Sequence, residues 1–158
     1  MSQPDTAARG IDPRSPRFGA GITAVLLLAD IFLGVAGVRG IALILLAALA
    51  LLFGWGAFAG IRRHPYGAIF RALIRPRLQP PTELEDPAPP TFAQGVGLVV
   101  TGVGAIIGIF VPAAVPIAAG LAFVAAFLNS VFGYCLGCQI YLALVRAGLI
   151  RRQTAAEA

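Results

Sequence analysis

The chain has 158 residues, of which 58% are hydrophobic and only 12% are charged, whereas about a quarter of the residues in an ordinary soluble domain are charged. One domain of this length has too small an interior to bury so much apolar side chain in water. The net charge is +5 and all 12 basic residues are arginine, but the arginines flank apolar segments instead of forming a patch on a soluble fold. We therefore expect an all-α membrane protein whose arginines meet lipid headgroups, and no binding to nucleic acid.

Four apolar segments are long enough to cross a bilayer, because a hydrocarbon core of about 30 Å takes about twenty helical residues. A backbone exposed to lipid must satisfy its own hydrogen bonds, so each crossing is predicted to be a helix. Pro112 and Pro116 bracket the turn before the fourth segment, since proline lacks the amide proton of a helix interior. The sequence predicts one membrane domain over residues 18–150, with tails at residues 1–17 and 151–158. Its spans are predicted at residues 18–38, 40–61, 92–111 and 117–138.

The fourth apolar segment continues without charge to Val145. At about 1.5 Å per residue it is too long for one straight crossing. The helix must therefore tilt strongly or break, and Gly133 and Gly137 mark where a break would fall. We favour a break near Gly133.

Arginine is distributed unevenly between the two predicted sides of the membrane. Arginines occur in the N-terminal tail, in the connection at residues 62–91 and after the fourth span, whereas the opposite side has only Arg39. The positive-inside rule then places both termini and the long connection in the cytoplasm.

The long connection contains a predicted amphipathic helix over residues 65–75. Its apolar residues fall on one helical face, and Pro65 suits a first helical position. We expect this helix to lie on the inner leaflet, with an extended proline-rich stretch after it. The predicted apolar face consists of Tyr66, Ile69, Phe70, Leu73 and Ile74. The candidate contacts to lipid headgroups or to a soluble partner are Arg62, Arg63, Arg71, Arg75 and Arg77.

Cys135 and Cys138 are the only cysteines of the chain, and we predict that they form a redox pair. On a helix this spacing puts both sulfurs on one face. A cytoplasmic location is reducing, which argues against a permanent structural disulfide. A reversible disulfide, a persulfide carrier or a soft-metal ligand remains, and the alternative is that both cysteines are small apolar residues packed between helices.

The predicted break decides how reactive these thiols are. In a continuous helix the cysteines lie near the C-terminal end, whose partial negative charge disfavours the thiolate. If a new helix begins at Cys135, its N-terminus instead favours the thiolate. Arg146, or Arg62 with Arg63, is expected to act in the same direction.

Asp30 and Asn129 are the polar residues predicted inside the membrane. A carboxylate in lipid is costly, so Asp30 must be protonated, paired or in contact with a wet cavity. Counting from the outer helix ends gives Asn129 a depth comparable to that of Asp30. We therefore predict a hydrogen bond between Asp30 and Asn129, which either joins the two helices or takes part in a proton relay.

His64 is predicted at the surface, at the membrane edge. The chain has one histidine and no lysine, so no histidine metal site and no phosphate loop are expected, and no cofactor is predicted.

Six short motifs of the chain occur together: Asp12-Pro-Arg-Ser-Pro-Arg-Phe18, Pro65-Tyr66, Arg75-Pro-Arg-Leu78, Glu83-Leu-Glu-Asp-Pro-Ala-Pro-Pro90, Phe92-Ala-Gln94 and Phe132-Gly-Tyr-Cys-Leu-Gly-Cys138. In this combination the chain resembles the bacterial membrane family known as domain of unknown function 4395, which is common in actinobacteria. The resemblance implies a small multi-span protein of the bacterial inner membrane with two cysteines at the end of its last span. Relatives encoded near thioredoxin-like or sulfurtransferase proteins imply thiol or sulfur chemistry with such a partner.

Three functions follow from these observations. The first is a cytoplasm-facing thiol–disulfide or sulfur-relay protein in which Cys135 and Cys138 exchange with a soluble thiol protein. The second is a non-catalytic subunit of a membrane complex, which needs only helix packing. The third is soft-metal handling, for which two thiolates make an incomplete site. Whether the protein is an enzyme or an oligomer is left open.

Overall fold

The computed structural model describes residues 10–150, and the parts of the predicted tails at residues 1–9 and 151–158 lie outside the described residues. Four helices of the described chain are long and apolar enough to cross a membrane. They are α1 (Arg14–Val35), α2 (Arg39–Ala59), α4 (Ala88–Gly108) and α5 (Ala114–Phe132). The predicted all-α fold with four spans is confirmed. Three helices match the predicted spans apart from shifts at their ends, and the fourth ends well before the predicted boundary at residue 138 because a glycine terminates it.

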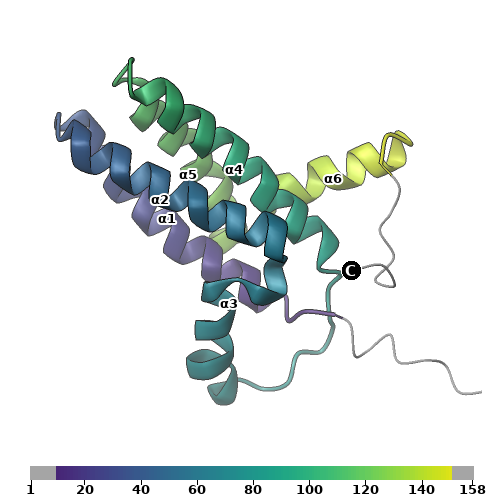
Figure 1. Cartoon of the computed structure of the whole chain (residues 1–158). Helices are drawn as coiled ribbons and strands as arrows, with labels where there is room; N and C mark the ends of the chain where they lie inside the picture. The colour runs from purple at the N-terminus through teal and green to yellow at the C-terminus, as the bar shows by residue number, and fades with distance from the viewer. Residues whose placement is uncertain (1–9, 151–158) are drawn as a thin grey trace, which may run out of the picture.

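The four spans form two helical hairpins that pack side by side. α1 packs mainly against α5, and α2 packs mainly against α4 (Figure 1). The short turns at residues 36–38 and 109–113 lie at one end of the bundle, in the upper left of Figure 1. The long connection between α2 and α4 lies at the opposite end, where Ile11 forms an isolated bridge with Glu85. Every described arginine except Arg39 belongs to segments at this second end, which we call the arginine end.

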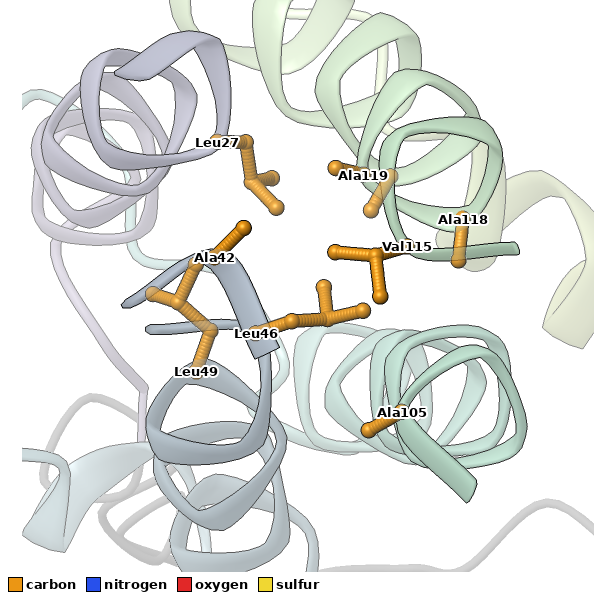
Figure 2. Packing of buried hydrophobic residues seen from close by; sticks show 9 residues of the cluster. Leu27, Ala42, Leu46, Leu49, Ala105, Val115, Ala118 and Ala119 are labelled. Carbon is orange, nitrogen blue, oxygen red and sulfur yellow. The ribbon is translucent and has the colours of Figure 1, made fainter. Parts of the chain in front are cut away.

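Small and aliphatic side chains of all four spans meet in the core. Figure 2 shows Leu27 of α1 pointing toward Ala119 of α5, with Leu46 of α2 between the helices. A Cβ on Gly104 would overlap Ala118, so the backbones of α4 and α5 approach closely there. Such close approach between small residues is a main source of helix association in membranes.

The outer surface of the bundle is apolar. Large hydrophobic side chains on every span are exposed, among them Val25, Leu51, Ile106 and Leu121. A belt of this kind is unfavourable in water and is removed from water by the hydrocarbon core of a bilayer. The spans and their exterior together indicate a multi-pass membrane protein.

The connection at the arginine end is helical where the sequence predicted a helix. It begins with η1 (Ile61–Arg63) and α3 (Pro65–Ile69), and it continues through the π turn η2 (Phe70–Ile74) and the 3-10 turn η3 (Arg75–Arg77). Pro65 occupies the start of α3, as predicted. The π turn shifts the phase of the helix, and this shift divides the predicted apolar face. Phe70 is 2% exposed and packs against Phe18, whereas Leu73 is 57% exposed.

The predicted break in the fourth apolar segment is confirmed. α5 ends at Phe132, and Gly133 adopts φ +68°, a left-handed conformation that favours glycine. A separate helix, α6 (Leu136–Arg146), then begins and leaves the bundle at an angle (Figure 1). α6 packs on α4, where a Cβ on Gly137 would overlap Ala93. The ring of Tyr141 lies 5.6 Å from that of Phe92.

Candidate functional site

The two cysteines lie at the start of α6. Cys135 is the N-cap residue of this helix, and its Sγ accepts a hydrogen bond of 3.2 Å from the backbone N–H of Cys138. The two sulfurs are joined in a disulfide, with their Cα atoms 5.2 Å apart. The predicted consequence of the helix break, that the cysteines begin a new helix, is therefore confirmed. In the reduced state, free N–H groups and the positive end of the helix dipole stabilise a thiolate at this position.

The disulfide forms part of the wall of a cavity of about 500 Å³. Residues of all six α-helices, α1 to α6, line the cavity, and the lining extends from exposed residues at the arginine end, such as Arg17 and Glu85, to residues within the spans. Val100 of α4 and Ala122 of α5 are among its lining residues. At about 1.5 Å per residue, Ala122 lies about 15 Å into the bundle from the end of α5. Both cysteines are half-buried, so the pair is in contact with the cavity without being sealed inside the protein.

Arg17 is the cation that the structure places beside the cysteine segment. Its guanidinium group lies so close to Gly133 that a Cβ there would overlap it, and it lines the same cavity. The arginines expected from the sequence do not take this position. Arg146 is at the far end of α6, about 15 Å from its start, and Arg62 and Arg63 are exposed and do not line the cavity. No local pattern identifies Arg17, because the fold alone brings α1 next to Gly133.

His64 is buried, so the prediction that it lies at the surface was wrong. It is 4% exposed, and its Nδ1 accepts a hydrogen bond of 3.3 Å from the N–H of Tyr66, which caps α3. The pKa of His64 is lowered, because burial disfavours the charged imidazolium. A hydrogen bond with the backbone of Leu52 acts in the opposite direction and only partly offsets this effect. Burial raises the pKa of Tyr66, and a hydrogen bond with Thr23 opposes this shift. His64 and Tyr66 both line the cavity, and both are therefore uncharged there at neutral pH.

Two side-chain amides, those of Gln94 and Asn129, also line the cavity. Gln94 is on the second turn of α4, and Asn129 is on the last turn of α5. Both amides therefore lie toward the same end of the bundle as the disulfide.

Asp30 does not pair with Asn129, and this prediction was wrong. Asp30 is fully buried, and neither carboxyl oxygen has a hydrogen-bond partner among the described residues. Because α1 and α5 are antiparallel, a Cβ on Gly21 would lie 3.8 Å from that of Ser130, so Asn129 is about 13 Å from Asp30 along the helix axis. The two depths were predicted by counting residues from the outer ends of the helices. Because α1 ends earlier than expected, Asp30 is closer to the outer end, and because α5 begins earlier than expected, Asn129 is farther from it.

The carboxyl of Asp30 is expected to cost stability. Replacing it by valine, which is also compact, should raise the free energy of unfolding by about 1–3 kcal/mol, because an unpaired polar group leaves the interior. The measurement is reversible unfolding of the detergent-solubilised protein. Asp30→Asn is the matched control, since it keeps a polar group there and should change stability little. A destabilised Asp30→Val protein would contradict the expectation and reveal a polar interaction of Asp30.

The arginines predicted to contact lipid headgroups or a partner are all exposed at the arginine end. Arg71 donates a hydrogen bond of 3.2 Å to the carbonyl of Arg62, and Arg77 donates one to the carbonyl of Leu73. Their role stays a prediction. The five residues are Arg62, Arg63, Arg71, Arg75 and Arg77.

These features define a class: a multi-pass membrane protein with a Cys-x-x-Cys pair at the N-terminus of a helix that follows its last span. Residues 11–146 match the family described as domain of unknown function (DUF4395), and the chain belongs to this family. Comparison with curated proteins and with solved structures gives no match. Within residues 10–150, no group of three or more histidine, cysteine, aspartate or glutamate residues is arranged to hold a metal ion.

Proposed function

We propose that this protein carries out thiol–disulfide exchange at the membrane through Cys135 and Cys138. The observation that carries the proposal is the disulfide at the N-terminus of α6, half-buried and in contact with a cavity. A permanently structural bridge needs no such setting, whereas an exchanging pair needs a stabilised thiolate and access. The bonded sulfurs favour exchange over sulfur relay, because a persulfide carrier needs a free thiol.

Cys135 is the attacking residue in this proposal. In the reduced protein, its thiolate accepts the hydrogen bond from the N–H of Cys138 and attacks a disulfide of the partner. A mixed disulfide forms through Cys135, and one partner thiolate leaves. The thiolate of Cys138 then attacks the sulfur of Cys135, which closes the intramolecular disulfide and releases the second partner thiolate. The pair is oxidised by two electrons and the partner disulfide is reduced by two, and the reverse reaction uses the same atoms.

The partner class is a soluble thiol protein of thioredoxin-like or sulfurtransferase type that acts at the arginine end. The positive-inside rule supports a cytoplasmic location for this end, and hence for both termini, in a bacterial inner membrane. The exposed side chains of Ile69 and Leu73 support contact between the α3 segment and the membrane surface. The exposed arginines beside them offer charge for lipid headgroups or for an acidic partner.

The test compares single-cysteine variants of the reduced, detergent-solubilised protein. Cys138→Ser keeps the proposed attacking thiol, and Cys135→Ser keeps the resolving one. We expect Cys138→Ser to form a mixed disulfide with oxidised glutathione roughly two- to fivefold faster than Cys135→Ser, the ratio that a helix N-terminus supports. The wild-type protein should instead close its own disulfide and release glutathione. Mass spectrometry of the intact protein follows all three reactions.

The double variant lacking both cysteines is the control for reaction at other groups. Labelling with a membrane-impermeant maleimide, in sealed vesicles of known orientation, reports the side on which the thiols lie. A wild-type pair that stays fully reduced across glutathione buffers that oxidise ordinary exchange proteins would refute the proposal. Labelling only from the periplasmic side would refute the proposed sidedness and leave the exchange chemistry standing.

A further inference from the structure

The cavity beside the disulfide joins two environments. At its mouth lie Arg17, Glu85 and Asp86, which are charged and exposed. Deeper in the bundle its lining is formed by apolar side chains of the spans, including Val100, Ala122 and Ala125. Because Leu121 both lines the cavity and is 64% exposed on the lipid-facing surface, the cavity also borders the hydrocarbon region.

The size and lining of the cavity fit a small amphiphilic molecule. A volume of about 500 Å³ lies within the range of small-molecule sites, which are mostly apolar with a few polar groups that orient the ligand. The polar groups here include the amides of Gln94 and Asn129. Each amide offers N–H groups to a carbonyl oxygen, and both are close to the end that holds the disulfide.

We propose that the cavity binds a lipid-soluble quinone, which takes electrons from the reduced Cys135–Cys138 pair. The inference rests on the proposed exchange function and adds a second redox partner to the same site. The amides of Gln94 and Asn129 donate hydrogen bonds to the quinone carbonyls, and the apolar part of the cavity holds the beginning of the isoprenoid tail. The rest of the tail leaves between the helices into the bilayer on the side of Leu121.

The reaction balances without any further reactant. The two thiols give up two protons and two electrons, and one S–S bond forms between Cys135 and Cys138. The quinone takes up the two protons and two electrons, so its two carbonyl oxygens become the hydroxyls of a hydroquinone. A phospholipid could fill the same apolar space, but it cannot accept electrons, so it gives no reason for a redox-active pair in the cavity wall.

The experiment uses the full-length protein in detergent, reduced with dithiothreitol and freed of it. Ubiquinone with a decyl tail is added, and its ultraviolet absorbance is followed while the protein's thiols are counted in parallel. We expect one quinone to be reduced per disulfide formed. We also expect no reaction in the variant with both cysteines replaced by serine.

Two variants test the cavity itself. Ala125→Phe fills the space, and Asn129→Leu removes an amide with little change in size. Both should slow quinone reduction by about tenfold or more, because displacement of the ring from the sulfurs is costly. Exchange with glutathione should change less than quinone reduction in both variants, because neither substitution replaces a cysteine. Val124→Phe is the matched control, since Val124 is next to Ala125 on α5 but is 52% exposed and does not line the cavity.

The outcomes separate this inference from the proposed function. A wild-type protein that exchanges with glutathione but does not reduce the quinone would overturn the inference and leave the exchange function intact. Failure of both reactions would overturn both. If Ala125→Phe and Asn129→Leu, each shown to be folded by thermal unfolding, reduce the quinone as fast as Val124→Phe, the cavity is not the quinone site and the inference falls.

Discussion

Substituting Gly104 by leucine should destabilise the bundle by about 3 kcal/mol, near the upper end of what overpacking a well-packed interior costs. A Cβ on Gly104 would overlap the Cβ of Ala118 and lie 3.6 Å from its Cα. The obstacle is therefore close to the backbone of α5 and cannot rotate away like the tip of a flexible side chain. α4 and α5 would have to separate along the core that Figure 2 shows. The measurement is the free energy of unfolding in mixed micelles.

Gly95→Leu is the matched control for this prediction. Gly95 is on the same helix, but a Cβ there meets nothing within 4 Å, so its substitution should change stability by less than about 1 kcal/mol. Adding Ala118→Gly to Gly104→Leu should recover part of the loss, because it removes the atom that is overlapped. Equal effects of Gly104→Leu and Gly95→Leu would show that α4 and α5 do not pack as described.

Substituting Gly137 by valine should release α6 from α4 while leaving the four spans folded. A Cβ on Gly137 would lie 2.6 Å from the Cα of Ala93, and α6 holds the disulfide at its first turn. We expect backbone amides of α6 to exchange hydrogen about tenfold faster or more, which corresponds to about 1.4 kcal/mol of local stability. Hydrogen exchange read by mass spectrometry, peptide by peptide, gives this result directly.

Gly120→Val is the control for that experiment, because a Cβ at Gly120 meets nothing within 4 Å. It should leave exchange in α6 unchanged. The Gly137→Val protein should also lose the cavity wall that α6 provides, so its disulfide should be reduced faster by dithiothreitol. Unchanged exchange in α6 would show that this helix is not held on α4 through Gly137.

The sequence alone determined those properties that depend on a short stretch of the chain and on the solvent around it. The four spans follow from hydrophobic length, because a backbone in hydrocarbon has no alternative to the helix. The break at Gly133 follows from the length of the last apolar segment and from the left-handed conformation that glycine adopts. The helix over residues 65–75 follows from its apolar period and from Pro65. Family membership was likewise visible in local motifs and is confirmed by the match over residues 11–146.

Only the tertiary structure decided which segments that are far apart in the chain come into contact. Small shifts in where α1 ends and where α5 begins changed which residues of the two helices face each other, and Asp30 and Asn129 are therefore at different depths. The packing of α3 beneath the bundle buried His64, and the approach of α1 to the end of α5 placed Arg17 beside Gly133. Such contacts depend on how helices pack around a core, and hydrophobic length carries no information about it. For that reason the sequence identified the cysteine pair, while the cavity and its amide and arginine neighbours emerged only from the fold.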